Sequence, residues 1–387
     1  MKNDLERLRY LVKKRKRSVL SKVIDFFLNS QYPAYLVGGV VRDFILNRRT
    51  NDIDITVEGN AIKAGYELNR ILKGRIEIHK DFNTATITLG DKKIDIAMAR
   101  KEEYPKPGSL PVVSPSDIYD DLKRRDFTIN AIALKLSKTD FVVLDPFKGY
   151  NDIKHRIIRI LHNKSFVDDP TRIFRALRYK NRLNFALSND TEELLVDAVS
   201  KKMINNVSGQ RILNELRLIF SERCYYEIVK DLYIYGIFNF DIERANKLKM
   251  ISEMRYYYFL SLLDIEYPLS NEERGIVRDF KILNLFIDDL SQVDTNSGLY
   301  DILNRFDDRV VKTIPELFPE FKNKVKKYLS LKKIKPFIDG EDLKTLNIKP
   351  GSVFKIILKG IYRMQLDGYI KSKKQALEVA KKWVKEY

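Results

Sequence analysis

The order of hydrophobic and polar residues divides the chain into two parts. From about residue 35 to residue 144, short runs rich in β-branched residues alternate with turn residues, which predicts strands of one mixed sheet. The runs are AYLVGG, DIDITV, RIEIHK, TATITLG, KKIDIAMA and FVVLDPF, with helical patterns GVVRDFILN and NAIKAGYELNRIL between them. After residue 150 the pattern becomes helical and stays helical to the C-terminus. We therefore expect an α+β chain, with a mixed sheet in front and an all-α part behind.

One predicted loop is unusually long. Residues 100–117, RKEEYPKPGSLPVVSPSD, are rich in Pro, Ser and Gly and lie between two predicted strands. A loop of this length in a compact domain is typical of a lid or a binding loop, or of a mobile segment.

Two carboxylates, Asp52 and Asp54, interrupt the apolar run DIDITV. Residues i and i+2 of a strand point to the same face, so these like charges lie close together and repel each other. A hard cation such as Mg²⁺ removes that repulsion and also binds substrate phosphate. The alternative is a polar edge strand whose acids meet Lys or Arg. The glycine turn that precedes the pair favours the metal site.

That turn is Gly38 and Gly39, between an apolar strand and a helical pattern that contains Arg42. A tight turn into a helix N-terminus offers backbone N–H groups to a phosphate, although a Gly-Gly pair by itself more often serves packing. Together, the turn and the aspartates indicate a nucleotidyl-transfer site. Asp95 is a candidate third carboxylate for two-metal chemistry, or else a strand-edge acid near Lys92 or Arg100.

The composition favours an anionic partner. The 387 residues carry a formal net charge of +18, and residues 321–387 contain 18 Lys and Arg against 6 Asp and Glu. RNA, DNA or an anionic membrane surface would each suit this charge. The basic run KKRKR at residues 13–17 is either a solvated helix face or an RNA-facing patch.

The cysteine and histidine content excludes two classes of structure. One cysteine, Cys224, cannot form an internal disulfide, and three scattered histidines form no Cys/His metal site. We expect the N-terminal residues to form neither a signal peptide nor an anchor, because no continuous apolar run follows their basic residues, and no run elsewhere approaches the roughly 20 apolar residues that span a bilayer. We expect a cytoplasmic protein without a membrane partner.

Five motifs follow one another in the order and spacing of a known family. They are YLVGGVVRDFILNRRTNDIDITVEGNA, DDLKRRDFTINAIAL, LDPFKGYNDIKHRIIRIL, SFVDDPTRIFRALRYKNRLNF and GQRILNELRLIF. The chain resembles the class II tRNA nucleotidyltransferases, the bacterial-type CCA-adding enzymes, which share a head with bacterial poly(A) polymerases in the DNA polymerase β superfamily. The resemblance is close over about residues 35–220, and DGEDLKTLNIKPGSVFKIIL is similar to the family's tail.

The resemblance implies a fold and four regions. A polymerase β-like nucleotidyltransferase head would occupy residues 1–148, with residues 100–117 as its flexible loop. A helical neck that selects the nucleotide would follow at 149–220, a helical body at 221–300 and a basic helical tail that binds tRNA at 301–387.

The resemblance also assigns roles to residues of the head. Gly38, Gly39 and Arg42 would bind the triphosphate, and Asp52 and Asp54 the metals. Within RRDFTINA, Arg125 would contact the incoming ribonucleotide, with Asp126 and Asn130 nearby. The alternative for Arg124 and Arg125 is a solvated turn beside acidic neighbours.

The stretch DDPTRIFRALR would choose the base. Helical spacing places Asp169, Arg172, Arg175 and Arg178 along one face. A carboxylate that accepts from an amine and a guanidinium that donates to the ring match the edges of cytosine and adenine, but not those of uracil and guanine. This is the role assigned to the EDxxR motif of the family.

Two alternatives apply to this stretch and its neighbour. Asp169 before Pro170 also has the pattern of a helix N-cap followed by proline. The family usually has Glu where this chain has Asp168, whose side chain is shorter. Glu215 and Arg217 of GQRILNELRLIF would be structural, in a helix that braces the nucleotide-binding helix.

The implied activity is addition of C, A or both to the 3′ end of tRNA without a nucleic-acid template. Its requirements would be Mg²⁺, ATP and possibly CTP, with the tRNA acceptor arm as partner. Addition of A alone, a poly(A) polymerase and a non-catalytic RNA-binding protein are the alternatives. The full-length loop argues against a CC-only enzyme, and its YPKPG segment leans toward the A-adding type.

Overall fold

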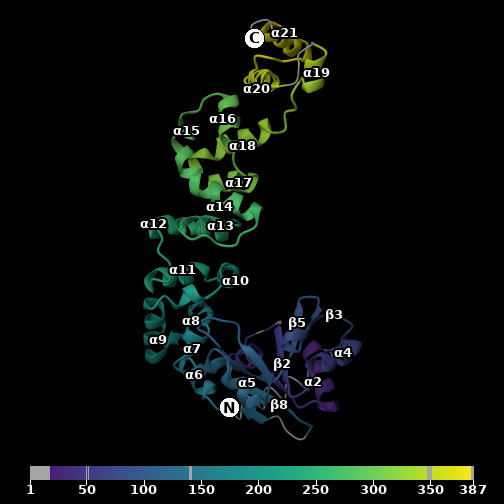
Figure 1. Cartoon of the computed structure of the whole chain (residues 1–387), viewed down its shortest axis with the longest axis vertical. Coiled ribbons are helices and arrows are strands. Elements are labelled where there is room, and N and C mark those ends of the chain that lie inside the picture. The colour runs from purple at the N-terminus through teal and green to yellow at the C-terminus, as the bar shows by residue number, and fades with distance from the viewer. Residues whose placement is uncertain (1–17, 49, 51, 139–141, 347–350, 385–387) are drawn as a thin grey trace. The chain divides into compact units, whose positions relative to one another are not determined.

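The computed structural model describes residues 18–48, 50, 52–138, 142–346 and 351–384. The basic run at residues 13–17 lies outside these ranges. The chain forms two compact units, Met1–Ile237 and Phe238–Tyr387. Figure 1 follows the helices and strands of each unit along the chain.

The first unit is built on a seven-stranded sheet in the order β3-β4-β5-β2-β1-β8-β9. β2 and β5 are parallel, and the other neighbouring pairs are antiparallel, so the predicted mixed sheet is confirmed. The strands are β1 (Ala34–Val37), β2 (Asp52–Val57), β3 (Arg75–His79), β4 (Thr84–Leu89), β5 (Lys92–Met98), β8 (Ala133–Leu136) and β9 (Val142–Leu144).

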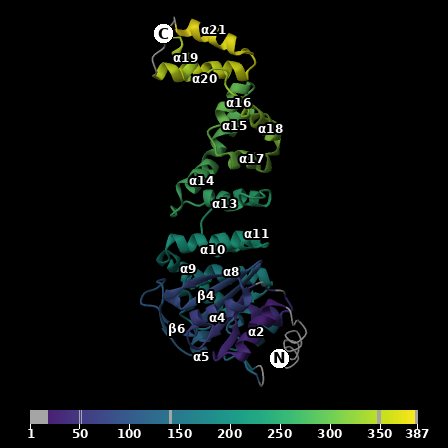
Figure 2. The ribbon, with the colours of Figure 1, turned by 90° about the vertical axis from the view of Figure 1, so that its right-hand side faces the viewer.

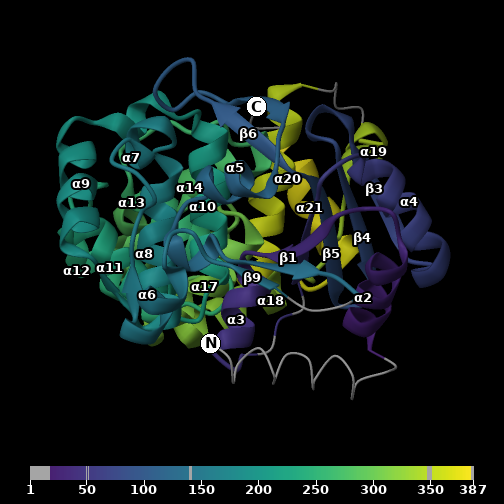
Figure 3. The same cartoon turned by 90° about the horizontal axis from the view of Figure 1, so that it is seen from below.

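Alternation along the strands separates a core face from a site face. In β2, Ile53 and Ile55 are buried, whereas Asp52 is exposed and Asp54 is half-buried on the opposite face. Helices α2 (Val19–Asn29) and α4 (Ala61–Leu72) lie on one side of this unit, and the neck helices lie on the other, as Figure 3 shows. The apolar side chains of the strand are buried on one face of the sheet, and the aspartates lie on the other face, which carries the site.

The long loop is more ordered than expected. Its two ends form an antiparallel ribbon, β6 (Arg100–Glu103) with β7 (Val112–Pro115). The expectation of a loop over residues 100–117 is therefore wrong at both ends, and the β-branched Val112 and Val113 favour this strand pairing. Only the tip between the strands, residues 104–111, has the expected turn character.

The remaining α-helices of the first unit lie between the strands of the sheet or after them in the chain. They are α3 (Gly39–Ile45), α5 (Ile118–Lys123), α6 (Gly149–His155), α7 (Ser165–Asp168), α8 (Thr171–Leu183), α9 (Asn189–Ser200), α10 (Gly209–Ser221) and α11 (Tyr225–Ile234). α8 contacts both α10 and α11. Phe174 and Leu177 of α8 and Leu213 of α10 are buried, so apolar packing holds α8 in place.

The second unit is entirely helical in its described residues, as predicted, and Figure 2 shows its helices in a second view. Its α-helices are α12 (Ile242–Ala245), α13 (Arg255–Leu262), α14 (Asn271–Leu283), α15 (Ile287–Gln292), α16 (Asn296–Leu303), α17 (Asp308–Leu317), α18 (Lys322–Leu331), α19 (Gly340–Lys344), α20 (Ser352–Leu366) and α21 (Lys373–Val384). Across the described part of the chain, no helix has the length and apolar character needed to span a membrane.

Candidate nucleotidyl-transfer site

A cavity of about 590 Å³ in the first unit brings head and neck residues together. Eleven of the thirteen site residues expected from the sequence line it, and Asp95 and Arg178 do not. Those that do are Gly38, Gly39, Arg42, Asp52, Asp54, Arg125, Asp126, Asn130, Asp169, Arg172 and Arg175.

The carboxylate pair lies on the site face of β2. Burial raises the pKa of Asp54, Arg125 opposes this change, and the nearby carboxylates Asp95 and Asp52 add to it. Asp54 therefore carries mainly the cost of burial, with a smaller cost from the like charges of Asp95 and Asp52.

Asp95 lies on β5, beside Asp54 of β2, but its carboxylate already accepts hydrogen bonds from two neighbouring side chains. It lies opposite Asp54 in the β2–β5 register, yet Thr86 Oγ1 donates to it at 2.6 Å and Lys93 Nζ at 2.7 Å. Among the described residues, no group of three His, Cys, Asp or Glu side chains is arranged to hold a metal ion. The role of Asp95 as a third ligand stays a prediction.

The glycine turn is required by both backbone and space. Gly38 has φ +66°, a conformation that residues with a Cβ rarely adopt. A Cβ at this position would lie 2.9 Å from Arg125 Nη1 and 3.7 Å from Asp54 Oδ2. The backbone at Gly38 thus approaches both the carboxylate pair and the arginine, where a side chain would obstruct a ligand.

Arg124 and Arg125 are not on a solvated turn, so that alternative is wrong. Their side chains are each 17% exposed, and both pair with the fully buried Asp121, at 2.6 Å and 2.9 Å. Burial would raise the pKa of Asp121, but the two arginines hold it below its ordinary value. This carboxylate fixes both arginines, and Arg125 also reaches Thr56 Oγ1 of β2 at 3.4 Å.

A chain of polar contacts ties the neck helix α8 to the head. Arg175 Nη2 donates to Asp126 Oδ2 at 2.6 Å, and Asn130 Nδ2 donates to Asp126 Oδ1 at 2.9 Å. Arg42 Nη1 in turn donates to Asn130 Oδ1 at 2.5 Å. Burial would raise the pKa of Asp126, but Arg175 and Asn130 lower it to about 2. Four expected nucleotide-binding residues are therefore also held to one another.

The proposed base-selecting pair differs from its expected helical placement. Asp169 precedes α8 with extended backbone, so it does not lie on the helical face with Arg172. Its Oδ1 accepts from the N–H of Thr171, the first residue of α8, at 3.0 Å, but Pro170 and not Asp169 occupies the N-cap position. Arg172 donates to Ser165 Oγ at 2.7 Å and to the carbonyl oxygen of Arg124 at 2.8 Å.

The three arginines on α8 that were expected to form one row lie in two different environments. Arg172 and Arg175 line the cavity, whereas buried Arg178 lies 3.4 Å from Glu215 Oε2 and 3.8 Å from Glu222 Oε1. Glu215 also lines the cavity, and burial raises its pKa. Arg178 is thus in a salt-bridge cluster with α10 and does not face the cavity.

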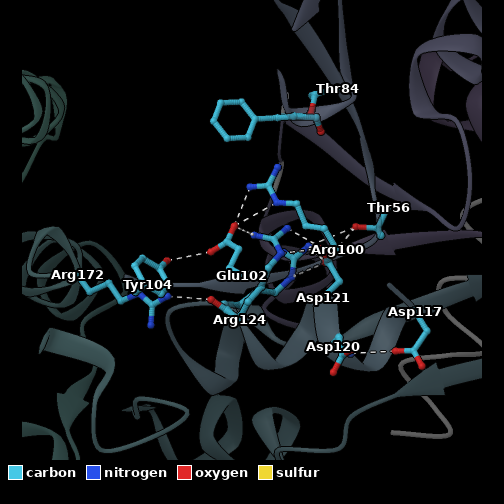
Figure 4. A network of polar contacts seen from close by, with 12 residues as sticks. Thr56, Thr84, Arg100, Glu102, Tyr104, Asp117, Asp120, Asp121, Arg124 and Arg172 are labelled. Atoms are coloured by element: carbon cyan, nitrogen blue, oxygen red, sulfur yellow. Dashed lines mark hydrogen bonds and ion pairs between the residues drawn. The ribbon is translucent and has the colours of Figure 1, made fainter. Parts of the chain in front are cut away.

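Sequence reasoning missed the contribution of the β6 strand. Glu102, whose side chain is only 6% exposed, accepts from Arg100 at 2.8 Å, from Arg124 at 3.0 Å and from Tyr104 at 2.9 Å. Figure 4 shows this network extending from Tyr104 and Arg172 to Thr56. The signal was present in part, since Arg100 and Glu102 are spaced two apart and share one face of β6, and Tyr104 follows the strand.

Tyr179 and Arg182 of α8 were also missed. Tyr179 is buried and lines the cavity, with the guanidinium carbons of Arg42 and Arg182 at 5.2 Å and 4.7 Å from its ring centre. The contact with Arg42 is invisible to a local pattern because it joins distant parts of the chain, whereas Arg182 lies three residues after Tyr179 on the same helix.

Comparisons with known proteins agree with this geometry. The family profile described as "Poly A polymerase head domain" matches residues 34–159, which assigns the head to the nucleotidyltransferases. An A-adding tRNA nucleotidyltransferase of Halalkalibacterium halodurans is 30% identical over 394 residues, covering 94% of this chain and 92% of the relative. The chain belongs to the bacterial tRNA nucleotidyltransferase family, whose relatives here include A-adding and CCA-adding enzymes.

Other relatives match in part. The A-adding tRNA nucleotidyltransferase of Aquifex aeolicus is 44% identical over 198 residues, or 51% of this chain. This chain spans 24% of that relative and 45% of an A-adding relative from Geobacter sulfurreducens, which is 32% identical over 90% of this chain.

Solved structures are similar along most of the chain. The Thermotoga maritima CCA-adding enzyme complexed with tRNA_CCA matches with a TM-score of 0.68 at 29% identity, covering 94% of this chain and 95% of that one. A complex of CCA-adding enzyme with ATP covers the same shares with a TM-score of 0.76 at 29% identity. The predicted fold class and family are confirmed.

Proposed function

We propose that this chain adds nucleotides to the 3′ end of tRNA, taking them from ATP and possibly CTP. One observation carries the proposal: the same cavity holds the Asp52/Asp54 pair, the Gly38 turn with Arg125, and the Asp169/Arg172 pair. A carboxylate pair, a phosphate-binding turn and a pair of groups suited to a base edge are the parts that nucleotidyl transfer from a selected nucleotide needs.

Asp52 and Asp54 would hold Mg²⁺. The site fits this ion, because two carboxylates share one face and Asp54 carries the cost of burial and of like charge. When bound, Mg²⁺ would neutralise charge on the phosphates during transfer. Gly38, Gly39 and Arg42 would bind the triphosphate, while Arg125, fixed by Asp121, would contact the ribonucleotide.

Asp169 and Arg172 would select the base. Arg172 is oriented by Ser165 and by the Arg124 carbonyl, and its remaining N–H groups can donate to a ring nitrogen or carbonyl. Asp169 supplies an acceptor for an exocyclic amine. Arg175, Asp126 and Asn130 would support this pair from the head, since they form one connected set of contacts.

The basic second unit would bind the acceptor arm by its phosphates. We propose four regions, with a head at residues 1–148, a neck at 149–220, a body at 221–300 and a tail at 301–387. We also propose that the protein acts in the cytoplasm. In unit 2, Arg305, Lys335 and Lys355 line a cavity of about 850 Å³ that suits contact with an RNA backbone.

Addition of A alone is the second candidate. Relatives described as A-adding match at 30% to 44% identity, whereas the CCA-adding relatives match at 26% to 29%. The intact β6–β7 hairpin is consistent with either candidate.

Three tRNA transcripts distinguish these functions. They end at the discriminator base, at C and at CC, and each is incubated with labelled CTP or ATP. Extension of only the CC-ended transcript, by one A, indicates an A-adding enzyme; extension of all three indicates CCA addition. Long A tails on an RNA without a tRNA fold would indicate a poly(A) polymerase, and no incorporation anywhere would overturn the proposal.

A further inference from the structure

Lys93 of β5 places a positive charge beside the carboxylate pair. In the parallel register of β2 and β5, Lys93 lies opposite Asp52. Asp95, two positions further along β5, lies opposite Asp54. Residues paired in this way share one face of a sheet, so all four side chains belong to the site face. Lys93 also interacts electrostatically with Asp52 and Asp54. A cation of the chain itself therefore lies among three carboxylates.

Both oxygens of Asp95 already accept a hydrogen bond. Lys93 Nζ donates to Oδ2 at 2.7 Å, and Thr86 Oγ1 donates to Oδ1 at 2.6 Å. The ammonium takes up the oxygen that a metal ion would need, and a metal ion on the same oxygen would be repelled by the ammonium charge. Asp95 is therefore a poor third ligand beside Asp52 and Asp54 while Lys93 keeps this contact.

The contact can open without disturbing the core. The side chain of Lys93 is 51% exposed and that of Asp95 is 28% exposed. An ion pair in such a position is weak, because water screens both charges. Ile94 and Ile96 are buried on the other face of β5 and hold the strand in place. Removal of the lysine side chain should therefore release Asp95 without unfolding the sheet.

We propose that Lys93 determines the ligand set of the metal site, because it holds Asp95 away from a bound divalent cation. The cation is then held by Asp52 and Asp54. This inference rests on the proposed function, which assigns those two aspartates to the metal. A cation with two protein carboxylates keeps more positions for water and substrate phosphate than a cation with three.

The first test measures Mn²⁺ binding to the full chain without nucleotide or RNA, from the electron paramagnetic resonance signal of the free ion. Lys93→Gln should tighten binding roughly fivefold, because the competing ammonium is gone and Asp95 is released. The control is Lys92→Gln, which removes the same charge from the opposite face of β5 and should keep the wild-type affinity. Unchanged or weaker binding in Lys93→Gln would overturn the inference.

A second test separates coordination by Asp95 from a general effect of charge. Eu³⁺ also prefers oxygen ligands, and its luminescence lifetimes in H₂O and D₂O give the number of water molecules that it coordinates. Lys93→Gln should lower this number by about one, as Asp95 replaces a water molecule, and adding Asp95→Asn should restore it. A wild-type number in Lys93→Gln would mean that Lys93 acts through its charge alone, which is contrary to the inference.

Failure of the proposed metal site gives a different result. If Mn²⁺ binds equally well after Asp52 and Asp54 are both replaced by Asn, the ion is held elsewhere in the chain. That outcome refutes the assignment of the two aspartates, whereas the comparison of Lys93→Gln with Lys92→Gln addresses the lysine.

Discussion

Asp52 and Asp54 occupy neighbouring positions on the site face of one strand but differ in their surroundings. Asp52 is exposed at the end of β2, whereas Asp54 lies deeper, where burial raises its pKa. The sequence pattern predicts that both side chains point to the same face of the strand, because this depends only on their spacing of two residues. The approach of Arg125 and Gly38 to Asp54 follows from the packing of separate segments.

Replacing either aspartate by Ala should abolish nucleotide incorporation. Loss of one carboxylate of the proposed metal site removes several kcal/mol of stabilisation, which corresponds to a fall of at least about a thousandfold in kcat/KM. Binding of tRNA, measured by filter retention, should survive. Asp91→Ala, at an exposed turn between β4 and β5, is the matched control and should retain activity. Substantial turnover in Asp52→Ala or Asp54→Ala would contradict the metal assignment.

At the scale of elements, helix α8 and the β6–β7 hairpin depart most from expectation. Helical spacing placed Asp169 on α8, but the helix begins at Thr171 because proline at 170 disfavours helical backbone in the residue before it. The hairpin was expected to be a loop because of its Pro, Ser and Gly content, and because RKEEY shows no alternation of apolar and polar residues. Its pairing joins residues 9 to 15 positions apart, from Glu103–Val112 to Arg100–Pro115. The contact of Glu102 with Arg124 joins residues 22 positions apart, and a local pattern does not show such contacts.

The contact between α8 and the head should make stability depend on acid pH. The pKa of Asp126 falls from 3.8 to about 2 in the folded chain, so its ionised form stabilises the fold above about pH 4. This contribution, about 2 kcal/mol, should be lost as the pH falls from about 4 toward 2. Urea unfolding across this range should show a shallower pH dependence for Asp126→Asn than for the wild type.

Asp25→Asn, at an exposed carboxylate of α2, is the control for this measurement and should follow the wild-type profile. Equal pH slopes in Asp126→Asn and the wild type would contradict the assigned role of the Arg175–Asp126 pair.

At the scale of the whole molecule, the charge excess belongs to the C-terminal part. Residues 321–387 carry 18 basic and 6 acidic residues, and within unit 2 several of the basic ones line one cavity. Charge of this kind is read from composition alone, whereas the gathering of residues from α16 and α20 around that cavity requires the fold.

Salt dependence of tRNA binding should report these contacts. Replacing both exposed Lys335 and Lys355 by Gln should reduce the slope of log Kd against log salt concentration by between roughly 1 and 2, since two phosphate contacts are lost. The double variant Lys63→Gln, Lys80→Gln removes the same charge from exposed positions of the head and should leave the slope unchanged. A wild-type slope in the Lys335/Lys355 variant would exclude this cavity from the RNA-binding surface.

The sequence alone determined the α+β class, the mixed sheet, the shared face of Asp52 and Asp54, and the family, because each depends on local periodicity or on motifs read in order. It also named most of the residues around the cavity. Tertiary structure decided which of them meet: it turned Arg178 toward Glu215, bound Asp95 to Thr86 and Lys93, and brought Arg211 to Asp169. Such pairings depend on how separate helices and strands pack, and side-chain contacts between distant segments leave no periodic signal in the chain.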